Sequence, residues 1–499
     1  MKRSRTAIES AAVFVVCAVT FYAMLQVTGP DPFDIDALFH YRVAELIRER
    51  GPWVDIDWLP FTVLGERGTD HQWLFHLLIA PLTLLGHDAA AVNAACAIAG
   101  AATAAAIVPI LRRAGVPWAG LVAVTMMFAA DILPARFIAL RAQNIALVLI
   151  LAMMFAIAWR RTAWVGVIAF LFTQSYHGAV IMGLLIACVL GAQAVRERRP
   201  QWSAITAVAI GVGAGLLLSP WFPRNAGYLV FHTVFKAGST APELVGTEWL
   251  PSTPRLLLMT CVAANGLLAS GFAAWAWRRR RASAVPWGVD TMAAVAMTGI
   301  FLGMSIYAWR FIEYYAPFAV LSGALLWRDA RAEPSGAGGV RPAFAYAMPT
   351  LLAAALAWGA HQGWNALEHT KRTPITAFRD MVAYAEAHDE RPMIFNGRWP
   401  DFQSMVFWTN RARYVAGLDG HYLAFGDPAR FAVWYSISRA GGPEAGNNAQ
   451  RVARAFGARW VIVARAQTRV AQSFAEDPAA RLVLADRDGW LFEVIATPP

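Results

Sequence analysis

The most concentrated set of reactive side chains lies in residues 31–42, between two long apolar runs near the start of the chain. A carboxylate above an apolar surface can take the proton of an attacking hydroxyl group, which speeds a reaction by roughly a hundredfold to ten-thousandfold. Asp36 is the best candidate, because it precedes a helix-like run over 37–50 and could cap that helix. The neighbouring candidates are a second carboxylate, Asp34, and the side chains His40, Tyr41 and Arg42.

The apolar runs on either side indicate a membrane protein. Of 499 residues 58% are hydrophobic and 15% are charged, which is far from the composition of a soluble domain. A membrane helix needs about 20 apolar residues. All four cysteines lie in apolar runs, so neither a disulfide framework nor a thiolate metal site is expected. Runs that are long enough to cross cover 11–27, 89–111, 204–218, 256–277 and 343–358.

Basic residues form short clusters between these runs, and the clusters predict the orientation of the chain. The formal charge of +10 does not indicate a nucleic-acid partner, because clusters of this kind mark cytoplasmic loops. About eleven membrane crossings keep every cluster on the cytoplasmic side. The N-terminus is then in the cytoplasm and the C-terminus outside, and the first apolar run is a retained anchor. The short apolar piece 73–85 must then be an embedded or interfacial helix. The clusters are 2–5, 112–113, 160–161, 196–199, 278–281, and 328–331 with Arg341.

This topology predicts a mainly α-helical protein in two parts. Residues 1–364 form a polytopic membrane domain with a large first external loop at 29–72. Residues 365–499 differ in pattern and form a small, soluble, extracytoplasmic α/β domain. Strands are expected at 392–396, 412–416 and 458–464, helices at 376–388, 402–409 and 448–456, and a closing hairpin at 482–496.

Five segments, in order along the chain, resemble those of one enzyme superfamily. The run Asp36-Ala-Leu-Phe-His-Tyr-Arg42 is similar to the signature in the first external loop of the oligosaccharyltransferase catalytic subunit, a member of the glycosyltransferase-C (GT-C) superfamily. The stretches 136–147, 245–251, 308–317 and 396–402 stand where that enzyme has further motifs. The resemblance spans most of the chain and implies a GT-C membrane domain whose site faces away from the cytoplasm.

The resemblance also implies roles for individual residues. Asp36 would accept the proton of the acceptor hydroxyl, Glu248 would lie near the acceptor, and Arg310 would hold the phosphate of a lipid-linked donor, with Arg141 and Arg224 as helpers. The implied reaction moves a sugar from a polyprenyl phosphate to an extracytoplasmic glycan, lipid or protein at the bacterial inner membrane. Inversion at the anomeric carbon is expected, since one carboxylate acts opposite the leaving group.

Two of the five segments depart from the family pattern. The stretch 136–147 has Arg141 and two amides, Gln143 and Asn144, where the family carries a second acidic motif. A Mg²⁺ or Mn²⁺ ion needs several oxygen ligands and would find only Asp36 and Glu248, so metal dependence is disfavoured. Residues 396–402 do not match the Trp-Trp-Asp motif that reads a protein sequon. Transfer of a single sugar is therefore favoured over N-glycosylation of proteins.

Plainer interpretations stay open for most candidates. Asp31, Asp55 and Asp57 of the first loop are typical of any solvated surface. Arg310 could be an interfacial arginine within an aromatic belt, or could pair with Glu313 one helical turn away. Glu248 could cap a loop, and His177 is more typical of a turn residue than of a base. Asp131 has the stronger claim to function, because an acid near hydrocarbon is costly.

Two other functions compete with the enzymatic hypothesis. A transporter or flippase for a lipid-linked saccharide would place charged or broken-helix sites near the bilayer midplane, in repeated halves, and the sequence shows neither feature. A non-catalytic envelope assembly protein, whose last domain binds glycan, is kept open by the missing second acidic motif.

Overall fold

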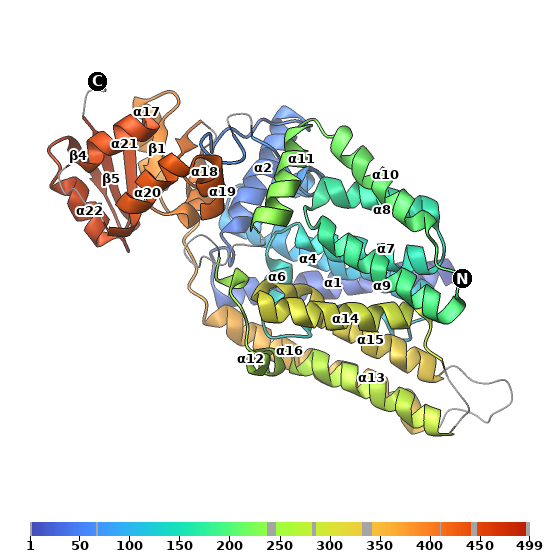
Figure 1. Ribbon diagram of the computed structural model, residues 1–499. Helices are drawn as coiled ribbons and strands as arrows, with labels where there is room; N and C mark the ends of the chain where they lie inside the picture. Colours follow the sequence, from blue (N-terminus) through green and yellow to red (C-terminus); the bar gives the residue numbers. More distant parts are fainter. Residues whose placement is uncertain are drawn as a thin grey trace.

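The helices of the computed structural model form one elongated bundle with a small sheet domain at one end (Figure 1). The structure describes residues 2–65, 68–236, 246–281, 286–331, 342–409, 411–440 and 447–495. The bundle helices are α1 (Lys2–Thr28), α4 (Ala89–Arg113), α5 (Ala119–Phe128), α7 (Gln143–Ala158), α8 (Thr162–Ser175), α9 (Ala179–Glu197), α10 (Ser203–Leu217), α12 (Pro254–Thr260), α13 (Val262–Arg281), α14 (Val289–Tyr307), α15 (Ile312–Arg331) and α16 (Pro342–Glu368).

Four helices of the described chain are long and apolar enough to cross a membrane: Ser4–Thr28 of α1, α4, α9 and α14. A fifth span results if α12 and α13, which are bent by 86° at their junction, count as one. The prediction of about eleven spans is not confirmed. The reason is that several apolar runs form helices of only 10–17 residues, among them α5, α7, α8 and α10.

Basic clusters gather at the end of the bundle that carries the N-terminus. Arg112 forms an ion pair with Glu9 near the start of α1. Arg328, at the end of α15, donates to the carbonyl oxygen of Ala114 at 2.8 Å and pairs with Asp290 at 2.6 Å. Clusters that are far apart in the sequence therefore share one end, as a single cytoplasmic side would require.

Short helices occupy the opposite end, next to the sheet domain. They are α2 (Asp36–Arg50), α3 (Trp73–Ile79), η1 (Ala80–Leu85), α6 (Leu133–Ile138), α11 (Arg224–Val230), η2 (Phe231–Lys236), η3 (Thr247–Trp249) and η4 (Trp309–Phe311). The apolar piece 73–85 is thus a short α-helix that continues as a 3₁₀ turn. Asp36 does not cap α2 as predicted, because it is the first helical residue. The carboxylate of Asp34 instead accepts the backbone N–H of Asp36 at 3.2 Å.

The C-terminal part folds around a five-stranded sheet with the order β2-β1-β3-β5-β4. The first three strands are parallel, while β5 is antiparallel to both β3 and β4. The predicted strands, helices and hairpin are all confirmed, and α19, α20 and α22 were not foreseen. The elements are α17 (Arg379–His388), β1 (Met393–Asn396), η5 (Trp399–Asp401), α18 (Phe402–Trp408), β2 (Arg413–Tyr414), α19 (Gly420–Gly426), α20 (Pro428–Ala440), α21 (Asn448–Phe456), β3 (Trp460–Ala464), α22 (Thr468–Ala475), β4 (Ala480–Ala485) and β5 (Gly489–Val494).

The loop that follows α2 packs directly against the sheet domain. The backbone N–H of Tyr414 donates to the carbonyl of Trp58 at 2.7 Å. A Cβ atom on Gly426 would lie 2.4 Å from the backbone of Thr62, so only glycine permits this approach. Helix α16 runs through the predicted domain boundary at residue 364 and ends at Glu368. The loop and the last domain therefore form one wall at this end of the bundle.

Candidate functional site

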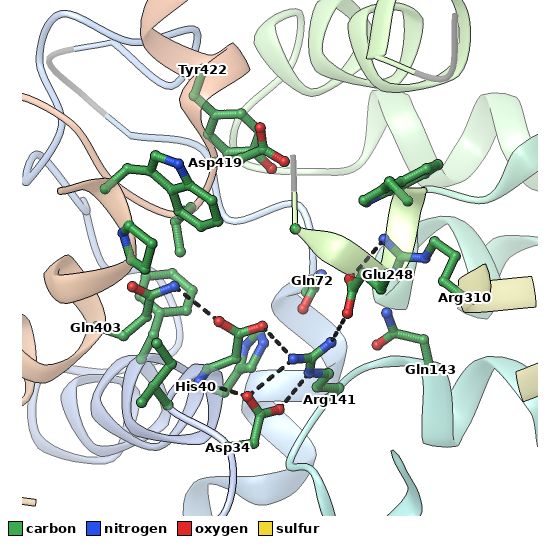
Figure 2. A pocket seen from close by; sticks show the side chains of 18 of the residues that line it. Asp34, His40, Gln72, Arg141, Gln143, Glu248, Arg310, Gln403, Asp419 and Tyr422 are labelled. Carbon is green, nitrogen blue, oxygen red and sulfur yellow. Dashed lines mark hydrogen bonds and ion pairs between the residues drawn. The ribbon is translucent and has the colours of Figure 1, made fainter. Parts of the chain in front are cut away.

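A cavity of about 250 Å³ lies where the short helices meet the sheet domain (Figure 2). Its lining comes from the start of α2, residues 71–72, the turn before α7, the turn before α9, η2, η3, η4 and the sheet domain. These segments are spread over most of the sequence. The floor is polar and charged, whereas Phe39, Trp249, Trp399 and Tyr422 add aromatic surface.

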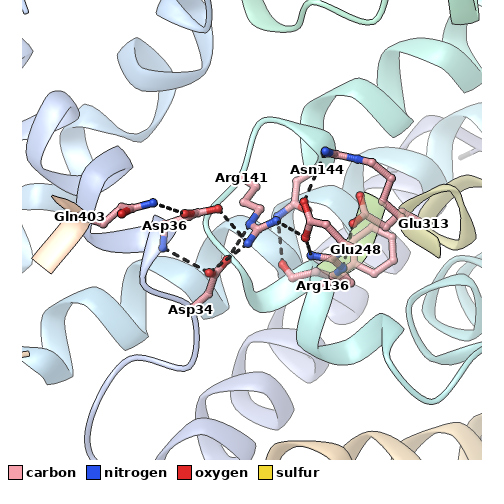
Figure 3. A network of polar contacts seen from close by, with 10 residues as sticks. Asp34, Asp36, Arg136, Arg141, Asn144, Glu248, Glu313 and Gln403 are labelled. Carbon is pink, nitrogen blue, oxygen red and sulfur yellow. Dashed lines mark hydrogen bonds and ion pairs between the residues drawn. The ribbon is translucent and has the colours of Figure 1, made fainter. Parts of the chain in front are cut away.

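The guanidinium of Arg141 joins three carboxylates of this cavity (Figures 2 and 3). It binds Asp34 through two parallel contacts, Nε to Oδ2 at 2.6 Å and Nη2 to Oδ1 at 3.0 Å. Nη2 also lies 2.8 Å from Oδ2 of Asp36, and Nη1 lies 3.3 Å from Oε2 of Glu248. The turn that presents Arg141 is fixed by the side-chain amide of Asn144, which donates to the carbonyl of Phe137 at 2.9 Å.

Glu248 is the second centre of the network, because three arginines surround it. Nη1 of Arg136 lies 2.8 Å from Oε2, and Nη1 of Arg310 lies 3.3 Å from Oε1. Burial by itself raises the pKa of Glu248, but Arg136, Arg141 and Arg310 outweigh burial and hold this pKa well below its usual range. The guanidinium of Arg310 also stacks on the ring of Trp249, 4.4 Å from its centroid. Glu248 is therefore an ionised anchor for the arginines.

Asp36 stands at the contact between the membrane part and the sheet domain. The side-chain amide of Gln403 donates to Oδ1 of Asp36 at 2.9 Å, while Arg141 binds Oδ2 (Figure 3). The side chain of Asp36 remains 34% exposed. Burial raises the pKa of Asp36 to about 6, and Arg141 opposes that rise. Such a carboxylate is ionised at neutral pH and still basic enough to accept a proton.

The carboxylates do not fit a divalent metal site. Asp36 and Glu248, the two ligands expected from the sequence, are both bound to the guanidinium of Arg141. Within the described ranges no three His, Cys, Asp or Glu side chains converge in a way that could hold a metal ion. Mg²⁺ and Mn²⁺ prefer several oxygen ligands, and here those oxygens already share an arginine. The positive charge at this position is supplied by the chain itself.

Three histidines and Tyr422 also line the cavity, and they form a wall together with Tyr228 behind them. The ring of His71 stacks on Tyr228 at 4.1 Å between centroids, and the rings of His177 and His232 lie 3.5 Å apart. The hydroxyl groups of Tyr228 and Tyr422 are hydrogen-bonded to each other. This wall joins α11 to α19 and so ties the sheet domain to the bundle.

A second polar chain starts at His40, on the same helix as Asp36. Nδ1 of His40 lies 2.8 Å from Nε2 of His76, and Nδ1 of His76 lies 2.7 Å from Oδ2 of Asp70. Burial lowers the pKa of His40 well below its usual range, and His76, Arg141 and His71 add to that effect. His40 is therefore a neutral imidazole that faces the cavity.

The structure brings most of the sequence candidates together. Asp34, Asp36, His40, Arg141, His177, Glu248 and Arg310 all line the cavity. The sequence left open a pairing of Glu313 with Arg310. Glu313 forms an ion pair with Arg136 instead, with 2.9 Å between Oε1 of Glu313 and Nε of Arg136.

Four sequence candidates lie outside this cavity. Tyr41 is fully buried and donates to the carbonyl of Gly86 at 2.5 Å. Arg42 pairs with Glu45 on the outer part of α2. Asp131 lies beside the junction of α12 and α13, where its backbone N–H donates to Thr260 at 3.1 Å. Arg224 lines a separate cavity of about 310 Å³ together with Trp53 and Asp55.

Several residues of the site were missed by reasoning from the sequence. Gln403 and Tyr422 come from the C-terminal domain, and Asp70 and His76 come from segments without a recognised motif. Arg136 begins the recognised stretch 136–147 but was not singled out. The other available signal was the stretch 396–402, which stands where the family has its acceptor motif. Trp399 lies in that stretch and Gln403 directly follows it. The other residues carry no local pattern that marks them.

No protein-family model matches the sequence, and no curated protein matches it. Solved structures do match the fold. The oligosaccharyltransferase of Archaeoglobus fulgidus superimposes with a TM-score of 0.61 at 14% identity, over 91% of this chain and 69% of that protein. ArnT from Cupriavidus metallidurans, solved with undecaprenyl phosphate, gives a TM-score of 0.57 at 13% identity, over 98% and 99%. The arabinofuranosyltransferase AftD from Mycobacteria gives 0.55 at 15% identity, over 100% of this chain but only 40% of its own.

These matches confirm the resemblance that the sequence motifs predicted. All three proteins are GT-C glycosyltransferases. At identities of 13–15% the likeness establishes the fold of this chain, and the activity has to be argued from its own cavity.

Proposed function

We propose that this protein is a membrane glycosyltransferase that moves a single sugar from a polyprenyl phosphate to an extracytoplasmic glycan, lipid or protein. One observation carries the proposal: Asp36, which can accept a proton, and Arg310, which can bind a phosphate, line the same cavity. Two structural neighbours support the donor class, since they were solved with dolichol phosphate and with undecaprenyl phosphate.

The proposed reaction uses the two sides of the cavity in one step. The acceptor hydroxyl gives its proton to Asp36 as its oxygen attacks the anomeric carbon. The bond between that carbon and the phosphate oxygen breaks, and the electron pair leaves with the polyprenyl phosphate. Arg310, which Trp249 and Glu248 hold in place, neutralises the charge that develops there. Attack opposite the leaving group gives inversion at the anomeric carbon.

Arg141 has a structural and electrostatic task in this proposal. Asp34, Asp36 and Glu248 would repel one another in a shared cavity, and the guanidinium of Arg141 binds all three. The network therefore needs no metal ion to join its carboxylates. Asp34 is a positioning residue, because both of its oxygens are bound by Arg141.

The direct experiment is mass analysis of envelope glycans from the source organism with and without this gene. We expect one sugar to be missing in the deletion strain and restored by the wild-type gene but not by Asp36→Asn. Binding of undecaprenyl phosphate to the purified protein tests the donor separately. Unchanged glycans in the deletion strain would reject the transferase. An accumulated lipid-linked saccharide whose sugar is still transferred would support a transporter instead.

A further inference from the structure

A line of three buried side chains leads from the cavity into the protein. His40, His76 and Asp70 are 8%, 2% and 7% exposed, and they are linked by the contacts of 2.8 and 2.7 Å described above. The reaction as written so far uses neither His76 nor Asp70. Burying an acid and two imidazoles is costly unless they are hydrogen-bonded to one another, as they are here.

The position of Asp70 fixes where the hydrogens of this line lie. A carboxylate oxygen accepts, so in this contact Nδ1 of His76 is the donor to Oδ2 of Asp70 and Nε2 of His76 has a lone pair. Nδ1 of His40 then donates to that lone pair. Nε2 of His40 is left with a lone pair toward the cavity, and no described residue hydrogen-bonds to it. His40 thus offers the cavity a proton acceptor (Figure 2).

We propose that His40, His76 and Asp70 form a proton relay that takes over the proton which Asp36 removes from the acceptor. The inference rests on the glycosyl transfer proposed above and adds a second stage to it. Asp36 and His40 are four residues apart on α2, a spacing that puts two side chains on the same face of a helix one turn apart. Both line the cavity.

The second stage conserves protons and charge. The O–H bond of protonated Asp36 breaks, and its proton reaches Nε2 of His40 through a water molecule in the cavity, which accepts one proton and gives up another. The proton on Nδ1 of His40 moves to Nε2 of His76 at the same time. His40 is again neutral, with the hydrogen now on Nε2, while His76 has become an imidazolium whose Nδ1–H donates to Asp70. Once the products have left, the proton returns from His76 through His40 and passes to water in the cavity.

The charges around the relay favour this direction. His40 faces His76 from α3, His71 from the preceding loop, Arg141 from the turn before α7, and Asp36 from its own helix. Arg141 disfavours a positive charge on His40 itself. A proton on Asp36 weakens its ion pair with Arg141, whereas a proton on His76 completes an ion pair with Asp70. The contact with Asp70 thus offers a partner for a proton at the buried end of the line.

Two substitutions separate proton transfer from structure. In His76→Gln the amide oxygen can accept from His40 and the amide N–H can donate to Asp70, but the amide cannot carry a proton. In Asp70→Asn the amide donates to His76, which reverses both imidazoles and presents an N–H to the cavity. His369→Gln is the matched control, since His369 is exposed at the end of α16.

The first readout does not depend on activity. Nitrogen-15 NMR of the full-length, histidine-labelled protein in lipid nanodiscs reports the tautomer of each ring. We expect an unprotonated Nε2 on His40 in the wild type and in His76→Gln, and a protonated Nε2 in Asp70→Asn. A protonated Nε2 in the wild type at pH 8, or no response to Asp70→Asn, would overturn the relay.

The second readout is the glycan product in complemented cells across a range of external pH. We expect His76→Gln to lower its rate of formation by about tenfold to a hundredfold, less than loss of the base itself, and to flatten its pH profile. Binding of undecaprenyl phosphate should not change, and His369→Gln should match the wild type. Full activity with an unaltered pH profile in His76→Gln would reject the relay. If wild-type cells form no such product, the proposed function fails and the relay fails with it; if the product forms but the NMR result is the opposite of that expected, only the relay is rejected.

Discussion

Nη2 of Arg141 lies 2.8 Å from Oδ2 of Asp36. The residue that the sequence marks as the base is therefore held by an arginine from the turn in which the family has acids. The same guanidinium reaches Asp34 and Glu248. The stretch 136–147 therefore lacks the acidic motif and supplies Arg141 in its place. The chain itself provides the cation that joins its carboxylates.

The first prediction concerns this built-in cation. Arg141→Gln leaves Asp34, Asp36 and Glu248 to repel one another, so we expect at least a hundredfold loss of transfer that added Mg²⁺ or Mn²⁺ does not restore. Treatment of the wild-type protein with EDTA should leave its activity unchanged. The measurement is the rate of glycan formation in membranes. A wild-type activity that EDTA abolishes and Mg²⁺ restores would contradict the assignment.

The second prediction is a pH profile. Asp36 must be ionised to accept a proton, and burial raises its pKa to about 6. Activity should therefore increase as the pH rises through about 6. Below that pH each Asp36 carboxylate binds one proton and can no longer act as the base. The rate of glycan formation between pH 4.5 and 8 checks this sign. A rate that is flat from pH 5 to 7 would show that Asp36 does not titrate in the active protein.

The third prediction compares Asp36, which lines the cavity, with Asp131, which the sequence also nominated but which lies outside it. Asp36→Asn should lower the rate of transfer by about a hundredfold to ten-thousandfold, because it removes the base but keeps the shape of the side chain. Asp131→Asn is the matched control, since Asp131 is also an acid near hydrocarbon but lies outside the cavity. We expect it to stay within about twofold of the wild type. Equal losses in the two variants would point to a general effect on folding.

The hydrogen bond from Gln403 to Asp36 gives a fourth prediction. Gln403→Glu replaces the donor by a second carboxylate next to Asp36, which raises the pKa of Asp36 further. The acidic limb of the pH profile should move to higher pH, with a smaller loss at pH 8 than at pH 6. Gln450→Glu, on the exposed face of α21, is the control with the same change of charge. An unshifted limb would mean that the sheet domain does not influence the base.

The fifth prediction tests the phosphate site. Lysine keeps the charge of Arg310 but cannot form two parallel hydrogen bonds or stack on Trp249 in the same way. Arg310→Lys should weaken binding of undecaprenyl phosphate by about tenfold to a hundredfold, the effect of losing a hydrogen bond to a charged group. Binding can be measured with labelled lipid and purified protein. A donor affinity equal to that of the wild type would remove Arg310 from this role.

The sequence was most informative where the signal is local. Apolar runs, basic clusters and the strands of the last domain depend on residues close together in the chain, and the structure has them nearly where they were expected. The number of membrane spans was a weaker prediction, because α5, α7, α8 and α10 are shorter than a full crossing. Arg42 and Tyr41 show the same limit, since they belong to the recognised motif but contact Glu45 and Gly86 and do not line the cavity.

By itself, the sequence determined that this is a membrane protein with an acidic loop, an arginine in the stretch 308–317 and a small mixed domain. Only the tertiary structure decided which side chains share a cavity. Arg141 and Asp34 are 107 residues apart, and Gln403 and Asp36 are 367 residues apart. Contacts at such separations depend on how several helices and a second domain pack together, and no short segment carries that information. The line from His40 to Asp70 became visible for the same reason, because a hydrogen bond is defined by distance in space.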